Sequence, residues 1–403
     1  MTMQALSGLK VVEWGEFISG PYCGKLLADL GAEVIKIERP GLGDKARSHG
    51  PFPQDIPHPE KSGTFLYLNT NKLGVTLNVR STTGAEIFKQ LVKQADILVE
   101  NNPPREVEEL GFNYESLKKL NPRLVMTSIT PFGQTGPYRD YKSCDLISFH
   151  VSGMAYINPS CGVDDIEQKP PLRGPENQSG LVAGLSGAIA TMSAIFSSHA
   201  TGLGQHVDIS EQEALDNVMR ITLGTYALEE VDWTRYRPAP LSEIYHCNDG
   251  LVYMVLDQDK TWLSWVEAMG NPEWAMSELF QDQVSRRENK DAGKMMIEEW
   301  TKEHTVDEIV RAAEARRIPC KAVNTVEEAV SSELLADRGY FVEVVHKAAG
   351  KFKYPGAPCK LSLTPWRVER PAPLLGENNE EVYCGRLGYT RQDLVTMRAQ
   401  GAI

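Results

Sequence analysis

Short β-rich runs alternate with helical patterns between residues 9 and 130, and this alternation constrains the fold more than any other feature. The predicted strands are Leu9–Trp14, Glu33–Glu38, Val75–Val79, Asp96–Glu100 and Leu124–Ile129. Predicted helices over Pro21–Leu30, Gly84–Lys93 and Tyr114–Leu120 lie between them. Strands joined through helices form crossover connections, so the pattern predicts an open parallel α/β sheet covered on both faces.

The second half of the chain predicts a further, smaller α/β unit. A strand over 205–209 and a helix over 211–219 continue the first domain, and the Pro-rich segment around 236–240 marks a boundary. A strand over 251–256, a helix over 260–269 and charged helices between 285 and 317 follow it. We therefore expect two domains in this chain.

Composition excludes several classes of function. The 403 residues carry a formal net charge of −12, which disfavours binding to a nucleic-acid backbone, so any anionic ligand needs a local cationic pocket. The apolar helix predicted over 178–200 is short and Ser-rich for a membrane span, and its glycines predict close packing inside a core. No secretory signal is evident at the N-terminus. We expect no membrane and no nucleic-acid partner.

Cysteine usage points to a reducing compartment. The seven cysteines are widely spaced and include no C-x-x-C pair, which is typical of reduced, cytoplasmic thiols. His246 and Cys247 are adjacent, but no second pair at ligand spacing accompanies them. We therefore predict a cytoplasmic protein without a metal site.

Glu176 is the strongest candidate for a catalytic carboxylate. It lies in the polar turn Arg173–Gly180, directly before the apolar helix predicted over 178–200. The N-terminus of a helix presents free N–H groups that favour an ionised, nucleophilic carboxylate and could stabilise an oxyanion beside it. The alternative is that Glu176 is only a first-turn or capping acid. Gly41 and Gly43 lack the third glycine of a dinucleotide fingerprint and fit a plain turn better.

Several segments occur together in one order along nearly the full chain. They include LSGLKVVEW (6–14), LADLGAEVIKIERPGLGD (27–44), ADILVEN (95–101), LGFNYESLKKLNPRLV (110–125), FGQTGPY (132–138), TGLGQHVDIS (201–210) and APLLGE (372–377). In these segments the sequence resembles the class III CoA-transferases, the formyl-CoA/carnitine CoA-transferase family. The resemblance implies an open Rossmann-like large domain built from both chain ends, a smaller α/β domain, and two subunits interlocked as a dimer. On this basis we expect the large domain over 1–220, a linker over 221–240, the small domain over 241–330, and a linker with the C-terminal return over 331–403.

The chemistry implied by the resemblance is transfer of CoA from an acyl-CoA, such as succinyl-CoA, to a free carboxylic acid. An active-site carboxylate forms covalent intermediates, and Glu176 occupies the matching position. The positions that match CoA-binding residues are Arg39, Arg80, Asn101, Arg105 and Lys142. No cofactor is expected to be bound permanently, because the CoA thioester is a substrate.

Three departures from the family pattern keep other functions open. The family nucleophile is Asp where this chain has Glu176, Glu109 replaces an expected Arg, and the stretch 241–245 lacks an expected glycine. In these departures the chain is most similar to the less conventional subunit of succinyl-CoA:benzylsuccinate CoA-transferase of anaerobic aromatic degradation. One alternative is therefore a catalytically degenerate subunit in a heterodimer or heterotetramer with a catalytic paralogue. Another is an acyl-CoA racemase-like enzyme using Asp145.

Overall fold

The computed structural model describes residues 4–158, 163, 165, 168–175, 177–231 and 241–403. The chain divides into two compact units. The larger unit comprises Met1–Ala155, Arg173–Val231 and Tyr340–Ile403, and the smaller comprises Tyr156–Leu172 and Asp232–Gly339. In place of the linker predicted from residue 221, helix α9 (Arg220–Glu229) extends the larger unit.

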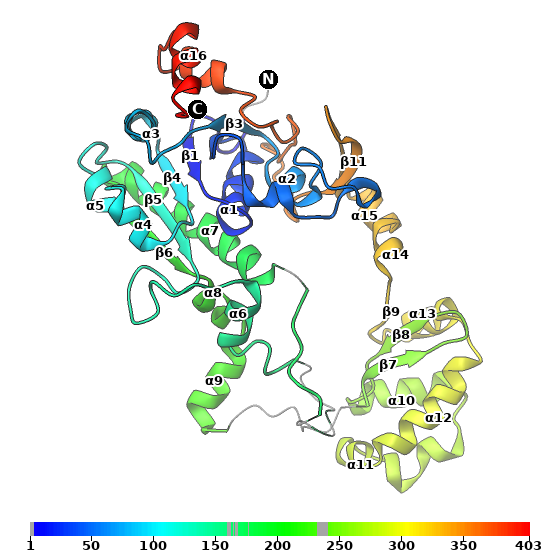
Figure 1. The fold of residues 1–403 in the computed structure, drawn as a ribbon. Coiled ribbons are helices and arrows are strands. Elements are labelled where there is room, and N and C mark those ends of the chain that lie inside the picture. The colour runs from blue at the N-terminus through cyan, green and yellow to red at the C-terminus, as the bar shows by residue number, and fades with distance from the viewer. Residues whose placement is uncertain (1–3, 159–162, 164, 166–167, 176, 232–240) are drawn as a thin grey trace. The chain divides into compact units, whose positions relative to one another are not determined.

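A six-stranded parallel sheet forms the centre of the larger unit (Figure 1), and the α/β class predicted from the sequence is confirmed. Its strands are β1 (Lys10–Trp14), β2 (Glu33–Glu38), β3 (Lys72–Thr76), β4 (Ile97–Glu100), β5 (Val125–Thr130) and β6 (His206–Ser210). The order β3-β2-β1-β4-β5-β6 is that of a doubly wound sheet. The strand order reverses between β1 and β4, so the carboxyl ends of these two strands border the crevice where such sheets bind ligands.

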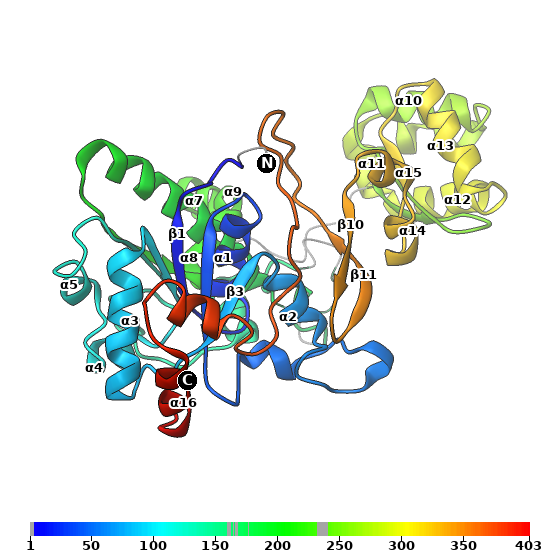
Figure 2. The same cartoon turned by 90° about the horizontal axis from the view of Figure 1, so that it is seen from above.

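Helices cover both faces of this sheet (Figures 1 and 2). On one face, α1 (Ser19–Ala28) and α7 (Gln178–Thr201) pack on Val11, Val34 and Val99. On the other face, α3 (Thr82–Gln94) packs on Val12 and Trp14. Successive residues of β1 therefore face opposite layers, as alternation along a strand requires. The remaining helices of the unit are α2 (Gly63–Leu68), α4 (Pro104–Glu109), α5 (Tyr114–Leu117), α6 (Asp145–Val151), α8 (Glu211–Val218) and α16 (Arg391–Ala399).

Helix α7 is the one helix in the described residues that is long and apolar enough to cross a bilayer. Half of its most apolar stretch is buried inside the structure. A Cβ at Gly180 would come within 2.9 Å of Ile18, and one at Gly187 within 2.9 Å of Ile129. These glycines allow α7 to lie close to α1 and β5, so its packing is that of a core helix.

The C-terminal segment closes the β3 edge of the sheet. The side chains of Asn378 and Asn379 accept hydrogen bonds from the backbone N–H groups of Gly74 and Thr76, at 2.9 and 2.8 Å. Tyr383 donates its hydroxyl to the Thr76 carbonyl at 2.8 Å. A hairpin of β10 (Phe341–His346) and β11 (Gly350–Pro355) precedes this segment. Both chain ends therefore build the larger unit.

The smaller unit has an antiparallel sheet and a core of its own. The sheet has the order β7 (Glu243–His246), β8 (Leu251–Met254), β9 (Cys320–Ala322). Its helices are α10 (Asp259–Ala268), α11 (Gln283–Glu288), α12 (Lys290–Lys302), α13 (Val306–Ala315), α14 (Val326–Val330) and α15 (Glu333–Asp337). Trp262 and Trp265 are the largest side chains buried in this core.

Candidate active site

A cavity of about 370 Å³ lies at the carboxyl ends of β1, β2, β3 and β4, beside the point where the strand order reverses. Three of the five predicted CoA-binding residues, Arg39, Arg80 and Asn101, line it. The other polar residues of the wall are Glu16, Glu38, Lys45, Asn78, Asn102 and Glu106. The fold thus brings residues from four strand ends to one place that suits a polar ligand.

Asn101 fixes the loop between β1 and α1. Its side-chain oxygen accepts a hydrogen bond from the Glu16 N–H at 2.8 Å, and its amide nitrogen donates to the Glu16 carbonyl at 2.8 Å. The same nitrogen donates to the Ser19 hydroxyl at 3.1 Å. A Cβ at Gly15 or Gly20 would lie 3.1 to 3.3 Å from this amide group, so small residues suit the loop. Within the described contacts, Asn101 acts as a positioning residue.

Each cation of the cavity wall is paired with a carboxylate. Arg39 Nε lies 2.9 Å from one oxygen of Glu16, and Lys45 Nζ lies 3.1 Å from the other. Arg80 pairs with Glu106 at 2.5 Å. The Arg39 and Arg80 side chains are half or more exposed, so these pairs can open at small cost. An anion entering the cavity must compete with Glu16 and Glu106.

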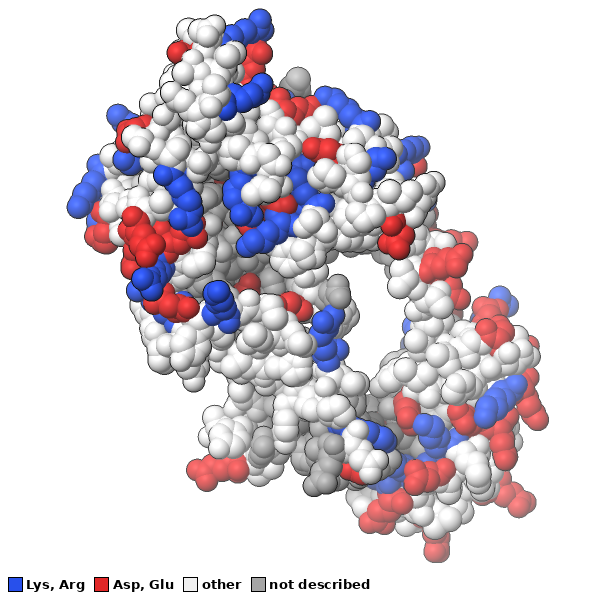
Figure 3. All heavy atoms as spheres, in the orientation of Figure 1, with Lys and Arg blue, Asp and Glu red and all other residues white. Residues whose placement is uncertain are grey.

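The structure places the other two predicted binding residues, Arg105 and Lys142, away from this wall. Arg105 lies on α4 with its side chain 78% exposed, and its Nε is 2.9 Å from Glu109 one turn later. This pair lies on the exposed surface of α4, and Arg105 does not line the cavity. Lys142 is exposed. Figure 3 shows basic and acidic side chains intermixed over the visible surface of the larger unit.

Glu176, the predicted nucleophile, lies outside the described residues. Asn177 follows it with a left-handed backbone, φ 66°, and α7 begins at the next residue. Near this helix start, Ser179 donates its N–H and its hydroxyl to Asp145 Oδ1, at 3.0 and 2.6 Å. Asp145, the acid of the racemase-like alternative, thus satisfies free donors of α7 in the manner of a capping residue.

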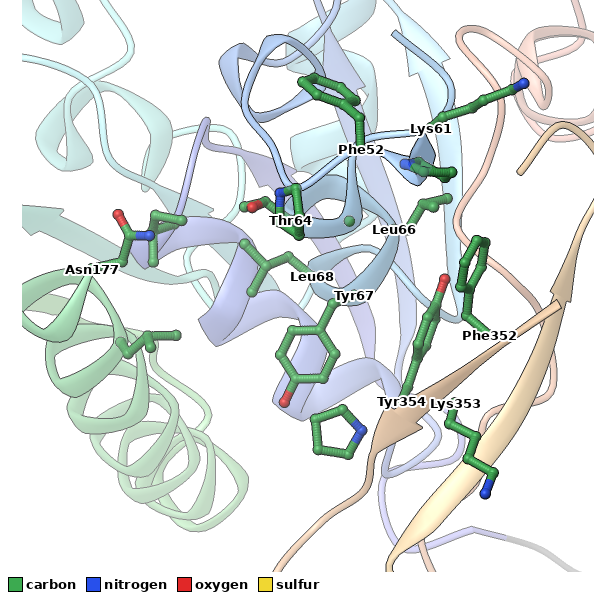
Figure 4. A pocket seen from close by; sticks show the side chains of 16 residues that line it. Phe52, Lys61, Thr64, Leu66, Tyr67, Leu68, Asn177, Phe352, Lys353 and Tyr354 are labelled. Carbon is green, nitrogen blue, oxygen red and sulfur yellow. The ribbon is translucent and has the colours of Figure 1, made fainter. Parts of the chain in front are cut away.

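A second and more apolar cavity, of about 500 Å³, is bordered by Asn177 and Leu181 at the start of α7 (Figure 4). Its opposite side is formed by Phe352 and Tyr354 of β11. The wall between them comes from Ile18, the segment 51–53 and α2. The sequence alone did not predict this cavity, because its walls lie about 300 residues apart in the chain.

Buried charges hold the loop between β1 and α1, which contributes Phe17 to the polar cavity and Ile18 to the apolar one. Lys36 Nζ lies 3.0 Å from Glu13, 2.7 Å from Asp44 and 3.0 Å from the Gly15 carbonyl. Asp44 accepts a hydrogen bond from the Phe17 N–H at 2.8 Å, where the backbone is left-handed with φ 67°. Burial alone would lower the pKa of Lys36, but Asp44 and Glu13 raise it overall. Lys36 therefore stays protonated and ties strand β2 to this loop.

Glu100, at the end of β4, is a buried carboxyl group beneath the polar cavity. It accepts hydrogen bonds from the Asn102 backbone N–H at 2.8 Å and from the Asn102 side chain at 3.3 Å. Burial raises the pKa of Glu100 to about 7, although Ser128 and Asn102 lower it in part. Asp208 adds to the increase. Glu100 therefore changes charge near neutral pH.

The raised pKa of Glu100 predicts a stability that falls as pH increases. A carboxyl group whose pKa is higher in the folded state contributes its full stability at pH values below its ordinary pKa of 4.5. This stability is lost as the pH rises through the folded-state pKa of about 7. Between pH 5 and pH 8, the free energy of unfolding of the wild type should fall by an amount on the order of 3 kcal/mol because Glu100 ionises. We expect Glu100→Gln to lack this decrease. Urea unfolding of both proteins at the two pH values measures it, and parallel pH profiles would contradict it.

Glu16, Lys45, Asn102 and Glu106 line the polar cavity but were not predicted from the sequence. Their distance from the strand ends could have identified two of them, because Glu16 and Asn102 each follow the last residue of a strand by two positions. Glu106 could not be predicted in this way, because it lies on α4 and reaches the cavity only through the placement of that helix. No group of three or more possible metal ligands occurs within the described ranges.

The larger unit is a doubly wound α/β sheet with a polar cavity at the strand-order reversal, where such sheets bind their ligands. The model of CoA-transferase family III matches residues 6–379. The chain therefore belongs to this family and is a CoA-transferase, which confirms the resemblance noted in the sequence.

Relatives with assigned activities cover the whole chain. Succinyl-CoA–D-citramalate CoA-transferase from Chloroflexus aurantiacus is 32% identical over 406 residues, which span 99% of this chain and 98% of the relative. The subunit BbsE of succinyl-CoA:(R)-benzylsuccinate CoA-transferase from Thauera aromatica is 31% identical over 98% of both chains. A solved CAIB/BAIF family protein from Brucella suis superposes with a TM-score of 0.84 at 26% identity, over 96% of this chain and 100% of that one.

Proposed function

We propose that this chain, alone or with a paralogous subunit, moves CoA from succinyl-CoA to a free carboxylic acid through Glu176. The observation that carries this proposal is the cavity at the strand-order reversal, where Arg39, Arg80 and Asn101 converge. Guanidinium groups there suit the phosphates of CoA. The relatives from Chloroflexus aurantiacus and Thauera aromatica carry succinyl-CoA in their names, which supports the choice of donor.

In the proposed mechanism, the Glu176 carboxylate attacks the thioester carbonyl, the C–S bond breaks, and a mixed anhydride and CoA thiolate form. The thiolate then attacks the Glu176 carbonyl, which releases succinate and leaves CoA as a thioester on Glu176. The acceptor carboxylate attacks this thioester to give a second anhydride and thiolate. Attack of the thiolate on the acceptor carbonyl releases the new acyl-CoA and restores Glu176. Each step conserves atoms and needs no redox partner.

The proposed assembly is an interlocked homodimer, or a heterodimer or heterotetramer with a catalytic paralogue, in the cytoplasm. Large apolar side chains are exposed on two helices of the larger unit, namely Ile189 (62%) and Phe196 (81%) on α7, and Ile221 (80%) and Leu228 (87%) on α9. Large exposed apolar side chains on neighbouring turns of one helix suit a protein interface. The Thauera aromatica relative is named as a subunit, which supports a heteromer as one form.

The test of this proposal measures CoA exchange by the purified chain alone and by a mixture with a paralogous chain. The paralogous chain has Asp at the position that corresponds to Glu176. Succinyl-CoA and a panel of carboxylic acids serve as substrates, and the new acyl-CoA is detected by mass. We expect exchange by the chain alone or by the mixture. The absence of exchange from both would contradict the proposal, and exchange by the lone chain would exclude a degenerate subunit.

The paired cations favour a second candidate, a subunit that has lost its own catalytic function. Glu16 holds both Arg39 and Lys45, and Glu106 holds Arg80. The phosphates of CoA would have to displace these carboxylates, which lowers affinity. Because the Arg39 and Arg80 side chains are half or more exposed, this loss is modest, and a structural or regulatory subunit tolerates it more readily than a self-sufficient catalyst.

Glu16→Gln tests whether this pairing limits CoA binding. Removing one negative charge beside two cations should tighten CoA binding by about tenfold at low salt, and the gain should shrink as salt increases. Glu86→Gln is the matched control, because its pair with Lys89 lies on the surface of α3 and outside the cavity. Isothermal titration with CoA measures both variants. Equal affinities of wild type and Glu16→Gln would show that Glu16 does not oppose CoA.

A further inference from the structure

The apolar cavity that borders the start of α7 has the size and location of a substrate pocket. Its volume of about 500 Å³ falls within the range of small-molecule sites. Asn177, on its rim, is the residue that follows Glu176, so the cavity lies within one residue of the predicted nucleophile. The cavity therefore borders the residue that follows the predicted nucleophile in the sequence.

The walls of this cavity are packed in place. Ile18, Leu66 and Leu68 are each at most 5% exposed. The Tyr67 and Tyr354 rings meet edge to face with centroids 6.4 Å apart. Lys25 Nζ lies 4.6 Å from the centre of the Tyr67 ring and is itself held by Asp29 at 2.7 Å. A pocket whose walls are held in this way is largely formed before a ligand binds.

The chemistry of the wall distinguishes among ligands. The wall is formed mainly by aliphatic, proline and aromatic side chains, and its described part contains no Asp or Glu. Lys61 and Lys353 are its only cations in that part, and Figure 4 shows their ammonium groups directed away from the centre. The Thr64 hydroxyl already donates to the Gly50 carbonyl at 2.7 Å. The centre of the cavity therefore complements an apolar group, and its wall carries no carboxylate in the described part that would repel an acid.

From this lining we infer that the cavity binds the apolar body of a carboxylic acid that carries an aromatic ring or a bulky alkyl group. This inference rests on the proposed function and names the class of acid that it acts on. A small, densely polar diacid would place its oxygens against a mainly apolar wall with few polar groups, which is less favourable. An aromatic ring would instead pack against Tyr67, Phe352 and Tyr354.

Binding of acids to the full-length chain tests this assignment without requiring turnover. Titration calorimetry with 3-phenylpropionate and with succinate should show at least about tenfold tighter binding of the aromatic acid, as expected for burial of a phenyl ring. Equal binding, or tighter binding of succinate, would overturn the inference. If no acid accepts CoA but the binding preference holds, the proposed function fails and the pocket assignment stands.

Variants of two opposite walls localise the effect. Phe352→Ala removes packing and Leu181→Trp fills part of the cavity, so each should weaken 3-phenylpropionate binding by about five- to tenfold. Succinate binding should stay nearly unchanged in both variants. Val345→Ala is the matched control, because Val345 is exposed on the same hairpin but outside this wall. Melting curves verify folding. If Phe352→Ala changes the oligomeric state and not acid binding, a second chain occupies the cavity and the inference is overturned.

Discussion

Replacing Glu176 by Gln should abolish CoA transfer, with kcat falling by a factor on the order of 10³ or more. The amide is nearly the same size as the carboxylate but is a poor nucleophile, so the first anhydride cannot form. Binding of CoA should change little, because the cations assigned to it lie at the carboxyl ends of the strands. Steady-state assays of the active assembly measure the rate, and calorimetry measures CoA affinity.

Glu115→Gln is a suitable control for this experiment. Glu115 lies exposed on α5 and pairs with Lys118 alone among the described residues. It should keep the wild-type rate. If Glu176→Gln also keeps this rate in an assembly with a paralogue, the covalent step belongs to the other chain and the degenerate-subunit function is correct.

Replacing Lys36 by Met should cause the largest loss of stability. Lys36 is fully buried between the carboxylates of Glu13 and Asp44, and Met would leave Asp44 without its cationic partner and Glu13 with Lys72 alone. Removing one member of a buried ion pair typically costs about 3 to 5 kcal/mol. Native-state hydrogen exchange of the β1 and β2 amides measures the free energy of opening of this region.

The same substitution should weaken CoA binding, because Lys36 also accounts for the position of the loop between β1 and α1. It donates to the Gly15 carbonyl, and its partner Asp44 accepts from the Phe17 N–H. Lys89→Met serves as the control, since the pair of Lys89 with Glu86 lies on the surface of α3 and should matter little. Unchanged exchange rates in Lys36→Met would contradict the role given to this buried network.

The sheet could be predicted because its strands are short apolar runs with regular spacing. Glu33–Glu38 was predicted with its observed bounds, and β1, β4, β5 and β6 within a residue at each end. The third strand was predicted at 75–79 but forms at Lys72–Thr76. Lys72 enters the buried strand because Glu13 neutralises it at 2.7 Å, and burial lowers its pKa to about 8. A charge buried with a distant partner leaves no local signal in the sequence.

The candidate site was predicted only where a local rule applied. Arg39 and Asn101 directly follow β2 and β4, where open α/β sheets bind their ligands, and both line the polar cavity. Arg105 lies outside the cavity wall, on the surface of α4 beside Glu109, and this placement depends on how α4 folds. The apolar cavity requires α2, α7 and β11 to meet, which only the tertiary fold reveals.

The central claim is that Glu176 carries the covalent intermediates, and trapping tests it most directly. The active assembly is incubated with succinyl-CoA and then with hydroxylamine or borohydride, and the peptide that contains Glu176 is analysed by mass spectrometry. We expect a hydroxamate with hydroxylamine, or the reduced alcohol with borohydride, at Glu176 and at no other carboxyl group of the chain. An unmodified Glu176 in an assembly that transfers CoA would contradict the claim.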